Sequence, residues 1–394
     1  MLALGLVLPV LPRLVRDMLG GDTAHAAKMV GLFGTSWALM QLLCSPLVGA
    51  LSDRFGRRPV ALISNFGQGF DYLVMAAAPS WAWLFVGRMV SGVTAASVSV
   101  GGAYIADITP NKDRARAFGL LGAAFNMGFI AGPALGGILG NVNPRTPFWV
   151  AGVLSLLNAV YGYFVLPESL AAHRRSAWSW RSVNPLASFT LLRSHRALMA
   201  LGAVALIANT ASEVLPNVTV LYTDVRYGWN ARTSGLMLAA AGLLGALVQA
   251  FAVQHMVQWF GEKRTLLLSL LAGVAGFLLY AGAGSGLAFC LGLPLMALSS
   301  AYAPVQQSLM TRYIRDDQQG SLQGAQSSLW GLAGLVGPQV FTWVFAASLD
   351  GHQMLGAPFL LAAVGLLASA GLARYTVSRL LDPAVEREAS AASS

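Results

Sequence analysis

The stretch GALSDRFGRRPV, residues 49–60, brings one carboxylate and three guanidinium groups together between two long apolar segments. Asp53 and the flexible Gly56 lie in the same short turn as the arginines. Arginine clusters are common in the cytoplasmic loops of membrane proteins, where positive charge fixes the orientation. The stretch therefore predicts a cytoplasmic turn between two membrane-spanning helices, with simple anchoring as the alternative to a functional role.

The composition of the whole chain also favours a membrane protein. Of its 394 residues only 10% are charged, whereas soluble domains carry about 25%. A water-exposed surface would need more polar side chains, so lipid must contact most of this one. The net charge of +9 comes from short basic runs without interleaved aromatic side chains, so we expect no nucleic-acid partner. Cys44 and Cys290 lie in apolar runs without metal-ligand spacing, and we expect neither a disulfide nor a metal or cofactor.

Apolar runs long enough to span a bilayer recur along the chain. About 20 helical residues cross the hydrocarbon core, and eleven runs of that kind lie near residues 29–51, 60–78, 81–106, 116–140, 147–166, 197–223, 232–258, 265–283, 286–309, 321–346 and 353–374. A twelfth, shorter run extends from Met1 to about Val15 and contains Pro9 and Pro12. It lacks the features of a signal peptide, and we expect the chain to start inside its first helix.

The basic residues orient these spans. With a cytoplasmic N-terminus, 18 of the 25 Lys and Arg residues fall on the inside and six on the outside. We therefore predict an all-α membrane protein with twelve transmembrane helices in two six-helix bundles and both termini cytoplasmic. The expected parts are an N-terminal bundle at 1–166, a cytoplasmic linker at 167–196, a C-terminal bundle at 197–376 and a cytoplasmic tail at 377–394.

Three motifs in register resemble the major facilitator superfamily. They are the stretch at 49–60, LFVGRMVSGVTAA with Arg88 in the fourth span, and GFIAGPALGG at 128–137 in the fifth. Six shorter strings, SDRFGRRPV, FDYL, YIAD, RYGWN, FGEK and QGSLQG, are similar to the tetracycline-resistance drug antiporters. The resemblance implies a secondary active transporter of the bacterial inner membrane. Such a carrier exports a small amphiphilic drug by alternating access, in exchange for protons, and we expect it to be a monomer.

The ionisable residues within spans are the candidates for proton coupling. Arg88 should face the protein interior and have a partner, because a charge in hydrocarbon is costly. Asp71 matches the position of an essential family acid, and Glu213 lies on a polar stripe with Asn209 and Asn217 at helical spacing. We predict that Asp71, Arg88 and Glu213 carry the coupling. The alternatives are a structural tether for Arg88, a hydrogen-bonded structural acid for Asp71 and a substrate or helix contact for Glu213.

Charged groups at helix ends and the glycine-proline motif are the gating candidates. Asp53 and Asp107 should contact the arginines of the 54–58 cluster, and such pairs matter only where they are partly buried. Glycines at helical spacing allow another helix to approach, and Pro133 adds a kink. The gating set is Asp53, Arg54, Arg57, Arg58, Asp107, Gly132 and Pro133.

Polar side chains on otherwise apolar helices are the candidates for substrate binding. Helix–helix hydrogen bonds are the alternative explanation for each of them. The predicted set is Gln41, Asn209, Asn217, Gln249, Tyr302, Gln306, Gln323 and Trp330.

The chain departs from the family pattern at three ionisable positions. The first-helix acid falls before Met1, the ninth-span acid falls at Gly273, and the eighth-span histidine falls at Gly245. An altered substrate, an altered coupling route and a non-transporting or differently coupled homologue that acts as a scaffold or receptor therefore remain open. We expect no enzyme, because the histidines lie in loops or near span ends and no nucleophile motif accompanies them.

Overall fold

A computed structural model gives the structure of residues 1–95, 98–110, 113–171, 175, 189–314, 318–350 and 354–380. The chain divides into two compact units. Unit 1 comprises Met1–Pro185 and Thr223–Ala239, and unit 2 comprises Leu186–Tyr222 and Ala240–Ser394. Most of the predicted linker and of the predicted tail lies outside the described residues.

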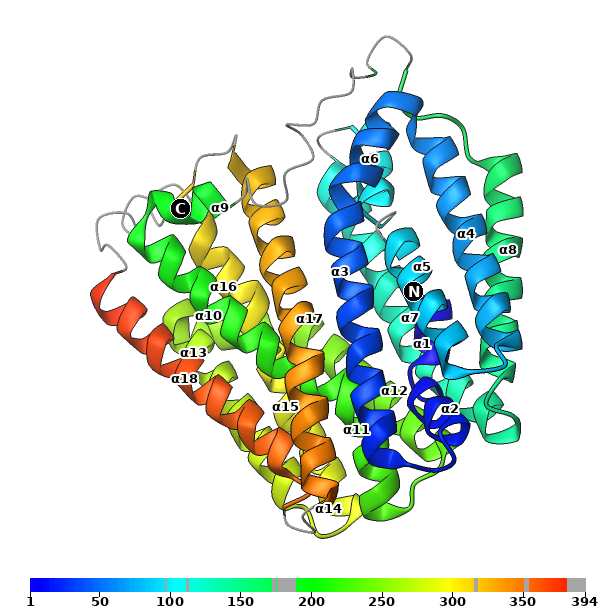
Figure 1. Cartoon of the computed structure of the whole chain (residues 1–394). Helices are drawn as coiled ribbons and strands as arrows, with labels where there is room; N and C mark the ends of the chain where they lie inside the picture. Colours follow the sequence, from blue (N-terminus) through cyan, green and yellow to red (C-terminus); the bar gives the residue numbers. More distant parts are fainter. Residues whose placement is uncertain are drawn as a thin grey trace. The chain divides into compact units, whose positions relative to one another are not determined.

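Unit 1 is built from helices alone within the described residues (Figure 1). The long α3 packs against α4 and α5, and α4 also packs against α8. Its helices are α1 (Leu2–Val7), α2 (Leu11–Met18), α3 (Thr23–Phe55), α4 (Arg57–Ala77), α5 (Trp81–Ala95), α6 (Val98–Ile108), α7 (Arg114–Val142) and α8 (Thr146–Val165), with the end of α11 (Val214–Tyr227) and the start of α12 (Ala231–Leu247).

Unit 2 is likewise helical in the part that the structure describes, and α18 packs against α10 and α13 (Figure 1). A π-helical turn at Val248–Ala252 joins α12 to α13. Besides the first part of α11 and the end of α12, the helices are α9 (Phe189–Ser194), α10 (Arg196–Ser212), α13 (Val253–Gly282), α14 (Gly286–Cys290), α15 (Leu293–Ser299), α16 (Tyr302–Thr311), α17 (Gln319–Asp350) and α18 (Ala357–Arg379).

Nine segments of the described chain are long and apolar enough to cross a membrane. The segment Ala231–Gly282 has 52 residues, which is enough for two crossings, and its backbone leaves the helical conformation at Gly261. The 21-residue α4 and the short α1 and α2 add further helices. This arrangement is consistent with the predicted twelve helices.

Large apolar side chains cover much of the outer surface of the helices. Four examples, each at least 65% exposed, are Ile63, Phe164, Phe251 and Leu287. Most of their neighbours along the chain are also apolar. Large apolar side chains exposed in this number are unfavourable in water but are solvated by lipid tails. The surface therefore supports a membrane environment for these helices.

Two breaks between helices lie at or just before a proline. The first apolar run forms α1 and α2, separated at Pro9, as its prolines predict. The predicted seventh span is divided into α10 and α11 at Glu213. Pro216 has no backbone N–H to donate to the carbonyl of Ser212, and α10 ends at Ser212. Glu213 is thus held at a helix break inside a span.

The glycines of α7 bring two other helices close to it. A methyl group on Gly132 would lie 2.6 Å from Cα of Gly5 in α1, and one on Gly137 would lie 2.9 Å from Cα of Gly235 in α12. A methyl group on Gly136 would collide with the Leu6 carbonyl. The predicted close approach at this motif is confirmed, and Pro133 lies within α7 at the same level.

Replacing Gly136 with alanine should destabilise the protein, because the new methyl group has no room between α7 and α1. Gly122→Ala is the matched control in the same helix, since nothing lies within 4 Å of its added methyl group. We expect Gly136→Ala to lower the unfolding temperature in detergent by several degrees, and Gly122→Ala to leave it unchanged or raise it slightly, because alanine favours helix by about 1 kcal/mol. Equal unfolding temperatures for the two variants would contradict this packing.

Candidate functional site

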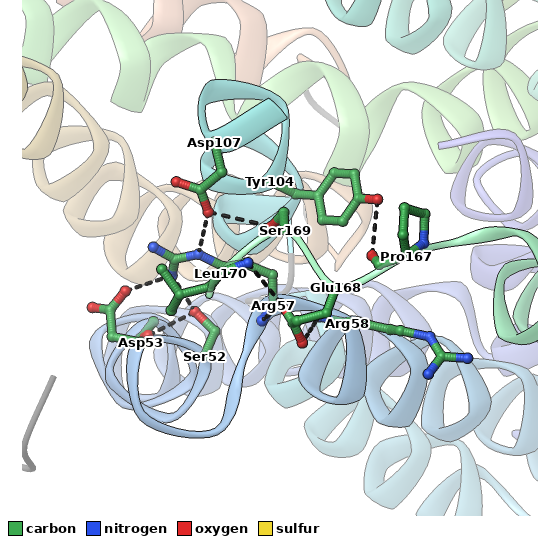
Figure 2. Close-up of polar contacts among 11 residues, drawn as sticks. Ser52, Asp53, Arg57, Arg58, Tyr104, Asp107, Pro167, Glu168, Ser169 and Leu170 are labelled. Atoms are coloured by element: carbon green, nitrogen blue, oxygen red, sulfur yellow. Dashed lines mark hydrogen bonds and ion pairs between the residues drawn. The ribbon is translucent and has the colours of Figure 1, made fainter. Parts of the chain in front are cut away.

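Arg57 is the centre of a polar cluster at the junction of α3 and α4 (Figure 2). Its Nη1 lies 2.5 Å from Oδ1 of Asp53 and donates to Oγ of Ser52 at 2.6 Å. Its Nε lies 3.2 Å from Oδ2 of Asp107, near the end of α6. The predicted contact of both aspartates with this arginine cluster is confirmed, and the Arg57 side chain is only 13% exposed. Partial burial strengthens such a pair relative to one on an open surface.

Glu168 belongs to the same cluster and was missed by the sequence analysis. Its carboxylate accepts hydrogen bonds from the backbone N–H groups of Arg57 at 2.9 Å and Arg58 at 3.3 Å. These are the unpaired donors at the start of α4, so Glu168 caps that helix although it follows α8 in the sequence. An acid directly after Pro167, at the end of a predicted span, was the available signal.

Gly56 makes this capping possible. Its φ of 106° and ψ of 156° lie in a region that is essentially restricted to glycine. A methyl group at Gly56 would also collide with the Glu168 carboxylate. The turn between α3 and α4 therefore requires glycine for its backbone conformation and for the approach of Glu168.

The other predicted gating arginines have different neighbours. Arg58 donates to the backbone carbonyl of Tyr163 at 2.6 Å and lies over the Tyr163 ring, which connects α4 to α8. The Arg54 guanidinium lies 5.2 Å from the ring of the adjacent Phe55. Tyr104 donates to the carbonyl of Pro167 at 3.0 Å and adds a contact between α6 and the segment after α8.

Asp71 and Arg88 are both buried inside unit 1, on α4 and α5, and their charges interact. The Arg88 guanidinium also lies 5.6 Å from the Trp37 ring of α3. Neither carboxylate oxygen of Asp71 has a hydrogen-bond partner among the described residues. Gly87 lets α4 and α5 meet here, since an added methyl group would lie 2.9 Å from Oδ1 of Asp71. The expectation that Arg88 faces the interior with a partner is confirmed.

Glu213 lies inside unit 2 beside Asn217, whose amide donates to the Glu213 carboxylate at 3.1 Å and to its backbone carbonyl at 2.9 Å. The side chain packs against α17, because a methyl group on Gly337 would lie 2.5 Å from Cβ of Glu213. The predicted polar stripe is thus divided. Asn217 and Glu213 interact with each other, while Asn209 accepts a hydrogen bond from Tyr302.

A cavity of about 280 Å³ lies within unit 2 between α10, α16 and α17. Five of the eight predicted substrate-binding residues line it, and none of the residues lining it is charged. Tyr302 donates to the Asn209 amide oxygen, and the Gln306 amide donates to the Leu201 carbonyl at 2.8 Å. The lining consists of Ala205, Asn209, Tyr302, Ala303, Gln306, Gln323, Gln326, Ser327 and Trp330.

The other three predicted substrate residues do not line this cavity. Gln41 is half-buried on α3 of unit 1, Asn217 is paired with Glu213, and Gln249 is exposed in the π-helical turn. Among the described residues no group of three His, Cys, Asp or Glu side chains is arranged to hold a metal ion.

A second ion-pair cluster lies before the start of α3, at the other end of that helix from Arg57. Nη1 of Arg16 lies 2.6 Å from Oδ2 of Asp224, and Arg13 lies 3.7 Å from the same carboxylate. Arg13 also donates to the Trp229 carbonyl. These contacts join α2 to the end of α11 and to the turn after it, within unit 1. The sequence analysis assigned these arginines no partner.

Comparisons with known proteins agree with this architecture. The sequence model of the Major Facilitator Superfamily matches residues 1–338. The chain is 42% identical to the class C tetracycline resistance protein of Escherichia coli over 88% of this chain and 86% of the relative. It is 38% identical to the class G tetracycline resistance protein of Vibrio anguillarum over 88% of each chain.

Solved structures of transporters have the same fold. The human organic anion transporter MFSD10 (TETRAN) is similar with a TM-score of 0.69 and 27% identity, over 94% of this chain and 95% of the other. The nucleoside transporter NupG is similar in fold with a TM-score of 0.78 and 14% identity, over 95% of this chain and 96% of the other.

Removal of the Arg57 side chain should slow transport more than it weakens substrate binding. Arg57 joins the ends of α3, α4 and α6 in unit 1, whereas the residues that line the cavity belong to unit 2. We expect Arg57→Ala to reduce the maximal efflux rate in vesicles several-fold with little change in substrate affinity. Arg54→Ala is the matched control, since its described contact is with Phe55 alone. An equal loss of rate and affinity in Arg57→Ala would indicate a binding role instead.

Proposed function

This chain belongs to the Major Facilitator Superfamily, and from that premise we propose that it is a secondary active transporter that exports a small amphiphilic drug-like molecule, tetracycline-like or from a multidrug range, in exchange for protons. The tetracycline resistance proteins support this proposal through identities of up to 42% over most of both chains. A transporter of this superfamily binds and moves its substrate without chemical conversion, so we assign no enzymatic role.

The observation that carries the proposal is the uncharged polar cavity in unit 2. Amide and hydroxyl groups from three helices surround a space of about 280 Å³, and Trp330 supplies an aromatic face that is 50% exposed. Small-molecule sites combine apolar and aromatic walls with a few oriented polar groups. This cavity suits a compact molecule with an aromatic or apolar face and several hydrogen-bonding groups.

Proton coupling is assigned to Asp71, Arg88 and Glu213. Asp71 is buried beside Arg88, and the two charges interact, so a change in the charge of Asp71 acts directly on Arg88. Gly273 occupies the position of the expected ninth-span acid. A methyl group added to Gly273 would lie 2.6 Å from Cδ1 of Leu366, so the site has no room for a carboxylate side chain. Glu213 is then the proposed coupling acid of unit 2, and it lies at a helix break inside a span.

Gating is assigned to two places in unit 1, the Arg57 cluster at helix ends and the glycine-proline motif inside α7. At the Arg57 cluster, ion pairs connect the ends of α3, α4 and α6. At Gly132 and Pro133, α7 is close to α1 and α12, and a proline inside the helix gives a bend that can change. Alternating access requires contacts at each end that form in one state and break in the other.

The partners and placement follow from the same reading. Lipid surrounds the helices, protons and a small molecule are the transported species, and the protein acts as a monomer in the bacterial inner membrane with cytoplasmic termini. The loss of the ninth-span acid supports the competing function of a non-transporting or differently coupled scaffold or receptor. Efflux of tetracycline from vesicles that carry the purified chain separates the two functions, because a scaffold produces no flux.

Replacing Glu213 with glutamine should remove the pH dependence of transport, because the amide keeps the size and the Asn217 contact but cannot titrate. The measurement is efflux from proteoliposomes with and without an imposed proton gradient, in wild type and Glu213→Gln. We expect exchange without a gradient to persist while gradient-driven efflux is lost. Asn217→Ala is the control for the local hydrogen bonds. Undiminished gradient-driven efflux in Glu213→Gln would exclude this acid from coupling.

Replacing Tyr302 with phenylalanine should weaken substrate binding, because the lost hydroxyl no longer orients the Asn209 amide toward the cavity. A hydrogen bond contributes about 1 kcal/mol, so we expect an affinity loss of about fivefold in tetracycline binding. Tyr222→Phe is the matched control, since its buried hydroxyl donates to the Tyr280 carbonyl at 3.1 Å and does not line the cavity. The same affinity in both variants would contradict a role for Tyr302.

A further inference from the structure

Two turns in the chain share one unusual backbone conformation. Gly56 has φ 106° and ψ 156°, and Gly261 has φ 75° and ψ 159°. Both lie in the region that is essentially restricted to glycine. Phenylalanine precedes each glycine, and a charged residue follows each one. The FGEK string therefore forms the counterpart in unit 2 of the arginine turn in unit 1.

Each turn makes an ion pair, but the signs are opposite. After Gly56 the cation Arg57 pairs with Asp107 of α6 at 3.2 Å. After Gly261 the anion Glu262 pairs with Arg312 at the end of α16, at 2.8 Å. A serine hydroxyl supports each pair. The Ser52 hydroxyl accepts a hydrogen bond from Arg57, and the Ser308 hydroxyl donates one to Glu262 at 2.9 Å. A serine hydroxyl can serve either pair because it both donates and accepts.

The opposite signs place the charges differently relative to the helix dipoles. Arg57 is the first residue of α4 and Asp107 is near the last residue of α6, so both charges lie at the helix ends that disfavour them. Glu262 follows the helix break at Gly261 and begins the next helical stretch, while Arg312 is the C-cap of α16. Both charges of the second pair lie at the ends that favour them.

The second pair also bears on the cavity. α16 carries Tyr302 at its first residue and Gln306 one turn later, and Arg312 is its C-cap. The Glu262 side chain is 16% exposed and that of Arg312 is 30% exposed, so the pair is partly shielded from water. Because α16 has only ten residues, fixing its C-terminal end also restricts the directions of the Tyr302 and Gln306 side chains in its first half.

We propose that Glu262 and Arg312 are positioning residues that hold α16, and with it the cavity wall, in one arrangement throughout the transport cycle, whereas the Arg57–Asp107 pair opens during it. The inference rests on the proposed function in that it concerns the cycle of a carrier. A pair supported by both helix dipoles stays closed. A pair opposed by both dipoles separates more readily when the surrounding helices move.

Cross-linking tests the two pairs directly. In a Cys44→Ser/Cys290→Ser background, the pairs Glu262→Cys/Arg312→Cys and Arg57→Cys/Asp107→Cys are joined by short reversible thiol cross-linkers. We expect efflux of tetracycline from vesicles to continue at an unchanged or higher rate after cross-linking at 262 and 312. Cross-linking at 57 and 107 should stop the remaining efflux, and reduction should restore it. Arrest by the 262–312 cross-link, or continued efflux with the 57–107 cross-link, would overturn the proposal.

A second measurement does not depend on transport, so failure of the proposed function is distinguishable from failure of this inference. The double variant Glu262→Arg/Arg312→Glu keeps the attraction but places both charges at unfavourable helix ends. We expect its unfolding temperature in detergent to lie below that of wild type and above that of Glu262→Arg or Arg312→Glu alone. A double variant no more stable than the single variants, or as stable as wild type, would contradict the pairing or its support by the helix dipoles.

Discussion

The absence of water within the hydrocarbon core is the constraint on which the rest of this structure depends. A polar group in a span must find a partner within the protein. The buried Gln306 amide therefore donates to a backbone carbonyl of α10, and Tyr302 donates to Asn209. Thr210 likewise donates to the carbonyl of Leu206 in its own helix. Asp71 has the charge of Arg88 as its neighbour, and in a buried site a change of charge on the acid has a large effect on its surroundings.

Small residues and helix breaks divide the molecule into parts that are fixed and parts that can move. The glycines of α7 fix how closely its backbone packs against α1 and α12, while Pro133 in the same helix allows the bend that the proposed gating uses. The ion pairs, by contrast, lie at helix ends, where charges are partly hydrated and their net contribution is modest. Contacts of that strength suit a carrier, because two states must be close in free energy for both to be populated.

Sequence patterns predicted what depends on local order and missed what depends on distant contacts. Asp53 and Arg57 are four residues apart at one helix junction, so the sequence could predict both the turn at Gly56 and this ion pair. Glu168 lies 111 residues from Arg57, and helical periodicity indicates a face of a helix but not its neighbour. For the same reason the polar stripe on Asn209, Glu213 and Asn217 suggested one lining, whereas the break at Pro216 gives its members different surroundings.

The surroundings of Glu213 connect the proposed coupling and substrate sites of unit 2. The acid packs on Gly337 of α17, and the same helix carries Gln323, Gln326 and Trp330 along the cavity. The expected ninth-span position offers no such route, since Gly273 packs on α15 and α18. A proton on Glu213 changes the charge beside α17 and its internal Pro338, where a bend can adjust. In the proposed carrier, the contact of Glu213 with α17 lets this acid couple protons to the substrate cavity, although the expected ninth-span acid is replaced by Gly273.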